Sequence, residues 1–400
     1  MEAEAGHKKG LGARIRSLPF LQAAFGKILA TYVAWLSFLL LFCFFFIALY
    51  HEFGQAPQFK AQGFFHHFFF WDAKWYLGIA QYGYRGFPAS LGWDAPYIAT
   101  SFFPLYPLLI RAFSYPFLGN YRAAALAISW ISTLLALHYL FQLTRFYQEE
   151  KVSYRACLSL LIFPSAIFLV CGYSEAVFLL CAVASFYHAR RSCWLASGIW
   201  GFLACLARPV GLAVFLAISL EALRQAGWKP SRLRPHTAWL LISPFGLASY
   251  LVYLKLEFGD FLILTEAEKV YWRRGFNPWG FFQAVGKVFT AEGFFTEQFA
   301  HYLYLVAFTC AFAVLVVFVF RRFGLPLGCY SLVCLAMPLL SSPPDMPLIG
   351  IHRYVLTIFP AFVILALWED NPYFEKFYMY ISVLGLAFFT VMFISDFWAG

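Results

Sequence analysis

Long apolar stretches separated by short polar loops constrain this chain most. Residues 28–50 carry no charge over a length that can cross a bilayer, because a helical span needs roughly 20 apolar residues. Similar stretches recur up to the carboxyl end, and only 12% of the 400 residues are charged. A soluble domain needs about 25% charged residues to cover its surface. The sequence therefore predicts an all-α polytopic membrane protein.

Ten further spans are expected, which gives about eleven membrane crossings. They cover residues 123–141, 156–170, 176–189, 194–207, 210–223, 238–256, 302–320, 325–340, 354–368 and 377–395. Residues 1–27 are polar and basic, and no small-residue cleavage site follows the first span, so we expect an anchor rather than a removed signal peptide. The predicted domains are a cytoplasmic basic amino terminus, 1–27, and one multi-span membrane domain, 28–400.

The segment 102–118 decides the topology, because it contains Pro104, Pro107 and Arg111 within an otherwise apolar stretch. If it lies along the outer interface, every basic cluster of the short loops falls on the cytoplasmic side, as the positive-inside rule requires. If it crosses, the later clusters all face outward. We therefore expect an interfacial helix here, with the amino terminus inside and the loops 51–122 and 258–300 outside.

The second outer loop, 258–300, has a pattern typical of helices that lie on a membrane. Residues 276–280 are expected to form a turn into an amphipathic helix. Four residues just before this turn fall at helical spacing: Glu266, Lys269, Trp272 and Arg273.

The first outer loop holds an acid beside a base in aromatic surroundings, in the stretch Trp71-Asp72-Ala73-Lys74. A carboxylate beside a lipid surface costs free energy that something must compensate. Sugar transfer to an alcohol needs a base that removes the hydroxyl proton, and Asp72 can serve as one. The alternative is an interfacial aromatic belt in which Asp72 caps a helix starting at Ala73 or pairs with Lys74.

A metal site has only weak support in the sequence. Asp94 is the other acid deep in the first loop, and with Asp72 it could hold a divalent cation. No Asp-x-Asp signature is present, and an aspartate before a proline is typical of a turn. His66 and His67 are adjacent, so their side chains point apart. We expect no tightly bound cofactor, with a divalent cation left open.

The cysteines and the net charge argue against a disulfide-stabilised protein and against a nucleic-acid-binding protein. The nine cysteines lie in or beside apolar stretches and form no CxxC motif, so we expect small packing residues rather than a disulfide framework. The net charge of +9 is dispersed between the spans. That pattern suits the anionic inner leaflet and membrane lipids, not nucleic acid.

Several polar groups distant in the sequence fall on the predicted outer side. An arginine there either snorkels to the headgroups or binds phosphate, whose oxygens match its planar fork. Glu175 follows a helix-capping serine, which explains both residues without any substrate. The candidate substrate-binding residues are Trp71, Lys74, Tyr173, Glu175, Arg208, Arg273, Arg274, His352 and Arg353.

Six motifs in register between residues 65 and 354 resemble the PIG-V family of mannosyltransferases, which belongs to the GT-C glycosyltransferase superfamily. The motifs are Trp71-Asp72-Ala73 with Ile79-Ala80 and Gly83-Tyr84, Phe103-Pro104-Leu105-Tyr106-Pro107, Pro164-Ser165-Ala166 with Tyr173-Ser174-Glu175, Arg208-Pro209-Val210-Gly211, Phe258-Gly259-Asp260, and Arg353-Tyr354. One departure is Pro209-Val210, where the family pattern has Ser-Asn, and this puts acceptor contacts there in doubt.

The resemblance implies a GT-C fold and a polyprenyl-phosphate or dolichyl-phosphate sugar donor, with mannose as the expected sugar. It also implies an inverting mechanism with Asp72 as the general base. The acceptor is then the hydroxyl of an extracytoplasmic glycan or lipid. The compact length suggests the bacterial branch, with the active site facing outward from the cell membrane; a eukaryotic relative has its site in the ER lumen.

A transporter or flippase of a lipid-linked sugar is the alternative from another class. A carrier should place polar groups at the bilayer midplane, between paired broken helices. Here the charged groups cluster on one face, which favours the enzyme.

Overall fold

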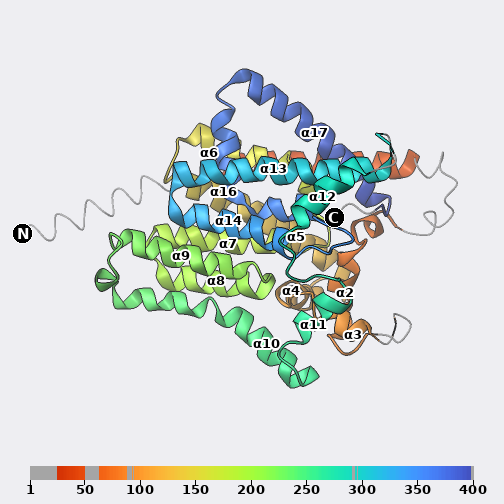
Figure 1. The fold of residues 1–400 in the computed structure, drawn as a ribbon, viewed down its shortest axis with the longest axis horizontal. Helices are drawn as coiled ribbons and strands as arrows, with labels where there is room; N and C mark the ends of the chain where they lie inside the picture. Colours follow the sequence, from red (N-terminus) through yellow and green to blue (C-terminus); the bar gives the residue numbers. More distant parts are fainter. Residues whose placement is uncertain are drawn as a thin grey trace, which may run out of the picture. The chain divides into compact units, whose positions relative to one another are not determined.

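The computed structural model describes residues 25–49, 63–87, 92, 94–290, 293–294 and 296–397. All regular elements within these residues are helical (Figure 1). The chain divides into two units, Met1–Gln55 and Ala56–Gly400. The first unit contains one described helix, Phe25–Leu49, which is long and apolar enough to cross a membrane.

Four helical segments of the second unit are also long enough to cross a membrane. They are α5 (Tyr121–Thr144), the continuous segment Pro235–Phe258 that includes α10 (Phe245–Phe258), α13 (Glu297–Phe323) and α17 (Pro372–Ile394). A further pair, Ile351–Thr357 and Phe359–Trp368, passes the same test together but bends by 84°. The multi-pass, all-helical prediction is confirmed. The expected count of about eleven spans is not, because five or at most six described helices meet the length and composition of a span.

The remaining predicted spans are helices that are short for a crossing. They are α6 (Glu150–Leu161), α7 (Glu175–Arg190), α8 (Trp194–Ala207), α9 (Gly211–Gln225), α14 (Leu325–Leu340) and α16 (Phe359–Trp368). The longest have 16 residues, which at a rise of about 1.5 Å per residue reach only about 24 Å. A sequence window cannot distinguish such a helix from a full span, since both are equally apolar.

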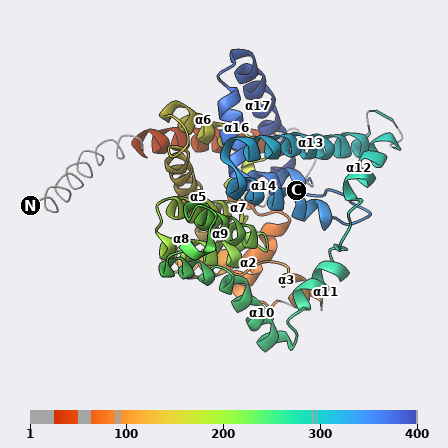
Figure 2. The same cartoon turned by 60° about the vertical axis from the view of Figure 1, so that its left-hand side comes forward.

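The core of the second unit forms around α7. Its apolar residues lie on every side, and 13 of its 16 positions are buried. Helices α5, α8 and α9 pack around it, α14 packs on α9 and α13, and α16 packs on α6 and α13 (Figure 2). All nine cysteines are free thiols, as predicted, and six of them are buried.

Basic residues gather at one end of this bundle. Helix α7 ends at Arg190, whose guanidinium lies 3.0 Å from Glu221 of α9 and 4.8 Å from the ring centroid of Tyr147. That ring contacts Phe323, the last residue of α13. The carboxyl ends of α7, α9 and α13 therefore meet there. Helices α2 (Asp72–Tyr82), α3 (Ala95–Ala99) and α11 (Ile263–Val270) lie at the other end (Figure 1).

The two predicted loop helices exist, with one change. Helix α4 (Leu105–Ser114) has ten residues, about 15 Å, which is too short to cross a bilayer. Helix α12 (Gly280–Phe289) follows the predicted turn and buries Gly280 and Ala284 while exposing Phe282 and Phe289. However, α11 ends at Val270, so Trp272 and Arg273 lie beyond the helix on which their spacing had placed them.

Candidate functional site

The first turn of α2 places Asp72 beside the segment that precedes α7. A Cβ on Gly172 would lie 2.5 Å from the Phe69 ring, so only glycine allows this approach. The Gly172 amide donates to the Phe68 carbonyl over 3.1 Å. Tyr76 Oη and Ser174 Oγ are 2.8 Å apart. These contacts hold two segments about 100 residues apart in the sequence against each other at the start of both helices.

Asp72 forms an ion pair with Arg353, from the short helix α15 (Ile351–Tyr354). Arg353 Nη1 donates to Asp72 Oδ2 over 2.6 Å, and the two side chains are only 6% and 13% exposed. Asp72 is the first residue of α2, and the N-cap position belongs to Trp71. The alternatives of a helix cap and of a pair with Lys74 are therefore wrong: Lys74 lies 5.5 Å from the Phe70 ring centroid instead.

Glu175 joins two arginines behind this pair. Its Oε1 atom lies 2.6 Å from Arg208 Nη1 and 3.1 Å from Arg353 Nε, and its side chain is 1% exposed. Glu175 is the first residue of α7, as the sequence predicted. A helix-start explanation alone is incomplete, because the carboxylate also neutralises two buried guanidinium groups. Ser174 does not cap the helix, since its hydroxyl contacts Tyr76.

Tyr354 is the centre of a cluster of three arginines. Arg274 Nη2 donates to Tyr354 Oη over 2.9 Å, and Arg353 Nη2 donates to the same oxygen over 3.4 Å. The guanidinium carbons of Arg208 and Arg274 lie 5.3 and 5.7 Å from the centroid of the Tyr354 ring. Like charges at such distances repel, so the cluster depends on Asp72, Glu175 and a third acid for compensation.

The third acid is Glu268 of α11, whose Oε2 atom lies 3.9 Å from Arg274 Nε. Burial raises the pKa of the Glu268 carboxyl above its ordinary value, and Arg274 partly opposes this effect. After α11 the chain turns sharply at Arg273, which has a φ of +53°, and the Arg274 amide donates to the Glu268 carbonyl over 2.8 Å. This turn directs Trp272, Arg273 and Arg274 to one cavity.

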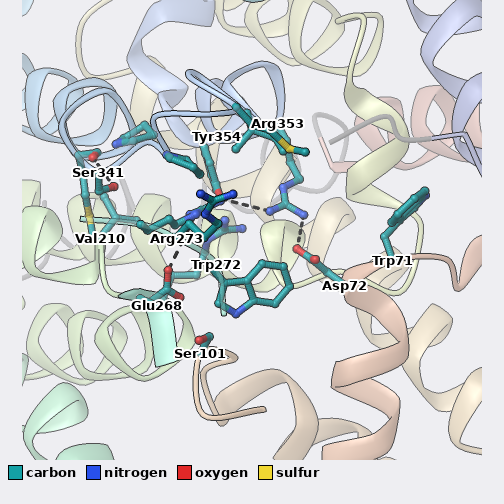
Figure 3. Close-up of a pocket in the computed structure, with 18 of the residues that line it drawn as sticks. Trp71, Asp72, Ser101, Val210, Glu268, Trp272, Arg273, Ser341, Arg353 and Tyr354 are labelled. Atoms are coloured by element: carbon teal, nitrogen blue, oxygen red, sulfur yellow. Dashed lines mark hydrogen bonds and ion pairs between the residues drawn. The ribbon is translucent and has the colours of Figure 1, made fainter. Parts of the chain in front are cut away.

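The cavity in front of these groups has a volume of about 910 Å³. Asp72 and Glu268 approach its guanidinium cluster from opposite sides (Figure 3). Part of its wall is apolar, formed by Pro209, Val210, Met337, Pro338, Ile349, Phe388 and Met392. The two residues at which the sequence departs from the family pattern, Pro209 and Val210, thus face this space.

Six of the predicted site residues line the cavity: Trp71, Asp72, Arg208, Arg273, Arg274 and Arg353. Arg273 lies at its exposed edge and pairs with Asp345 over 2.8 Å.

Four other predicted residues lie outside the lining. Tyr173 and Glu175 are buried behind it, and Tyr173 Oη donates to the Phe70 carbonyl over 3.3 Å. His352 stacks on Phe389 with 4.8 Å between the ring centroids, as a packing residue does. Lys74 points toward the Phe70 ring.

The metal prediction gains no support from the fold. Asp94 precedes α3 and interacts with Tyr271, outside the cavity lining next to Asp72. No group of three histidine, cysteine, aspartate or glutamate side chains suited to a metal ion occurs within the part of the chain that the structure describes.

Sequence reasoning missed Glu268 as a site residue. It singled out Glu266, two residues earlier and on the exposed side of α11. The signal that could have found Glu268 is its position next to Ala267, because Ile263 and Ala267 form the buried side of this short helix. Tyr354 was read only as part of a motif, although it holds the arginine cluster together.

Comparison with solved structures gives distant likenesses. The structure of ArnT from Cupriavidus metallidurans bound to undecaprenyl phosphate matches with a TM-score of 0.49 and 13% identity, over 81% of this chain and 69% of that one. The oligosaccharyltransferase from Archaeoglobus fulgidus in its apo form matches with a TM-score of 0.43 and 12% identity, over 92% of this chain and 56% of that one. The chain thus spans about half the length of that enzyme.

A comparison with models of protein families finds a match over part of the chain. No match was found among curated proteins. Residues 55–227 match the family model described as mannosyltransferase (PIG-V). This region contains the predicted base Asp72, the acid Glu175 and the arginine Arg208. The resemblance drawn from the motifs is therefore confirmed over residues 55–227, where the chain is similar to the PIG-V mannosyltransferases.

Proposed function

We propose that this protein transfers a sugar, with mannose as the family's expectation, from a polyprenyl-phosphate donor to an acceptor hydroxyl, with inversion. Asp72 is the general base. The observation that carries the proposal is the position of the Asp72 carboxylate on the wall of a large cavity, beside three arginines that converge on Tyr354. Guanidinium groups that line a cavity match phosphate oxygens, so a phosphate-bearing substrate suits this cluster.

The reaction follows from this arrangement. The acceptor O–H bond breaks and its proton passes to Asp72, while the acceptor oxygen bonds to the anomeric carbon. The bond between that carbon and the phosphate oxygen breaks, and its electron pair stays on the phosphate. Attack opposite the departing phosphate inverts the anomeric centre. A preorganised donor at such a developing charge contributes about 3–4 kcal/mol to transition-state stabilisation.

The basic end of the bundle supports an active site on the outer side of the membrane. Arg190, Arg224 and Arg321 lie at the carboxyl ends of α7, α9 and α13. Asp72 and Glu175 lie at the amino ends of α2 and α7, so the 16 residues of α7 separate the two groups. Because basic residues favour the cytoplasmic side, the cavity opens on the opposite side. A donor that crosses the bilayer as a lipid-linked phosphosugar meets this requirement.

The apolar part of the cavity wall suits the first isoprene units of such a lipid. Met337, Pro338, Phe388 and Met392 form a side of the cavity without charged groups. The flippase alternative lacks comparable support, because the charged residues that line the cavity belong to one end of the helices rather than to paired broken helices at the midplane.

The test is a transfer assay with purified protein. Polyprenyl-phosphate mannose and polyprenyl-phosphate glucose are incubated separately with candidate acceptors, and release of polyprenyl phosphate is measured. Asp72→Asn should lower turnover by about 10²–10⁴-fold, the usual contribution of a general base, without preventing membrane insertion. Asp94→Asn, in the same loop but outside the cavity lining, is the matched control and should keep its activity. Near-wild-type transfer by the Asp72→Asn variant would exclude Asp72 from this role.

A further inference from the structure

Arg353 differs from the other two arginines of the cluster, because all three of its nitrogen atoms already have partners. Nη1 contacts Asp72, Nε contacts Glu175, and Nη2 contacts Tyr354. Its side chain is 6% exposed. The contact with Asp72 is made at Nη1, so an anion that replaces Asp72 would bind there.

Arg208 and Arg274 are better placed to meet the donor first. The ion pair of Arg208 with Glu175 uses Nη1, and the contacts of Arg274 with Glu268 and Tyr354 use Nε and Nη2. Both guanidinium groups line the cavity, 5.3 and 5.7 Å from the centroid of the Tyr354 ring. They can hold the donor phosphate while Arg353 still holds Asp72 in place.

We propose that Arg353 exchanges Asp72 for the leaving phosphate during sugar transfer. This inference rests on the proposed function. Arg208 and Arg274 bind the donor phosphate before transfer. Arg353 binds the additional negative charge that forms on the phosphate during transfer.

The charge balance of the reaction gives the reason. Before transfer, Asp72 carries one negative charge and the donor phosphodiester carries another. After transfer, Asp72 holds the acceptor proton and is neutral, while the phosphate has become a monoester with a charge of about −1.5 to −2 at pH 7. One negative charge has moved from the partner of Arg353 to the phosphate. Arg353 therefore loses its ion pair when the phosphate needs a new one.

The geometry allows the exchange without a large movement. Glu175 holds Arg353 Nε at 3.1 Å and remains charged throughout. Nη2 already lies 3.4 Å from Tyr354 Oη, the atom that Arg274 contacts at 2.9 Å. Only Nη1 has to change its partner, and it does so within the cluster that holds the phosphate.

The test compares the binding of two lipids that do not react. Polyprenyl phosphate represents the monoester product, and a polyprenyl methyl phosphodiester represents the charge of the donor. Their dissociation constants are measured for the wild-type protein, Asp72→Asn and Glu268→Gln. Asp72→Asn imitates the neutral acid after transfer and should shift the preference toward the monoester by about tenfold or more. Glu268→Gln removes a carboxylate from Arg274 and should leave the ratio within about twofold, because Arg274 serves both lipids.

A double variant identifies the group responsible. Adding Arg353→Lys to Asp72→Asn keeps the positive charge beside Glu175 but removes the fork, and it should return the ratio to the wild-type value. An unchanged ratio in Asp72→Asn overturns the exchange, and so does a shifted ratio that survives in the double variant. If neither lipid binds the wild-type protein, the proposed function fails and the exchange fails with it.

Discussion

Glu175→Gln offers the sharpest test of the charge network, because the substitution keeps the shape of the side chain and removes only its charge. The Glu175 carboxylate lies 2.6 Å from Arg208 Nη1 and 3.1 Å from Arg353 Nε. At an effective dielectric constant of about 20, unit charges 2.6 Å apart attract by about 6 kcal/mol before desolvation is subtracted. Removing one partner of a buried ion pair typically costs about 3–5 kcal/mol of stability, because the remaining charges stay buried and uncompensated.

The chain contains a natural control for this experiment. Glu221 also joins two arginines, with Arg190 Nη1 at 3.0 Å and Arg224 Nη2 at 2.7 Å, but it does so at the basic end of the bundle. These arginines are 19% and 37% exposed, against 11% and 6% for the partners of Glu175. Water stabilises these more exposed guanidinium charges better, so Glu221→Gln should lower the stability of the protein less than Glu175→Gln does.

Thermal unfolding in detergent and the transfer assay together measure the difference. A loss of 3 kcal/mol corresponds to a Tm decrease of about 4 °C for a chain of this size. Glu175→Gln should show that decrease and lose at least about 10²-fold in turnover, because Arg353 no longer holds Asp72 in position. Glu221→Gln should retain its turnover. If Glu175→Gln transfers sugar at the wild-type rate, the network has no part in positioning the base.

Three other outcomes are expected. Arg274→Lys should raise the donor KM about tenfold, with a smaller effect on kcat, because a lysine lacks the planar fork that matches two phosphate oxygens; steady-state kinetics at varied donor concentration measure this. Lys74→Met should keep transfer within about twofold, since the ammonium group lies over Phe70 and outside the cavity lining. The raised pKa of Glu268 means that its contribution to stability is present below the unfolded-state pKa and is lost as the pH rises through the folded-state pKa. The Tm of Glu268→Gln relative to that of the wild type should therefore rise between pH 4.5 and pH 7, and a constant difference contradicts the raised pKa.

The sequence predicted which charged residues line the cavity better than it predicted their contacts. Asp72, Arg208, Arg274 and Arg353 were identified as candidates because charges in apolar or aromatic surroundings need an explanation. Their pairing was not accessible in the same way. Spacing along the chain does not show that Arg353, and not Lys74, is the partner of Asp72 at 2.6 Å. That contact depends on how α2, α7 and α15 pack.

The fold was predictable to a similar extent. Apolar stretches gave the correct positions of the helices but too many spans, because hydrophobicity measures burial whether a side chain faces lipid or protein. Helix α7 is an example: its surroundings are other helices on all sides. Glu268 was missed because the sequence does not show which side of its helix faces the cavity. It lies on a helix of eight residues, where the side that faces the cavity is defined by tertiary contacts.

The contact between Asp72 and Arg353 also has a consequence for biosynthesis. The two residues are 281 positions apart, so the ribosome completes most of the protein before the arginine that neutralises Asp72 exists. Until then the acid must remain in water or at the headgroups, which keeps the loop around α2 from settling between the helices. Closure of this region is thus a late step of assembly, and a nascent chain that stops short of α15 carries an unneutralised acid.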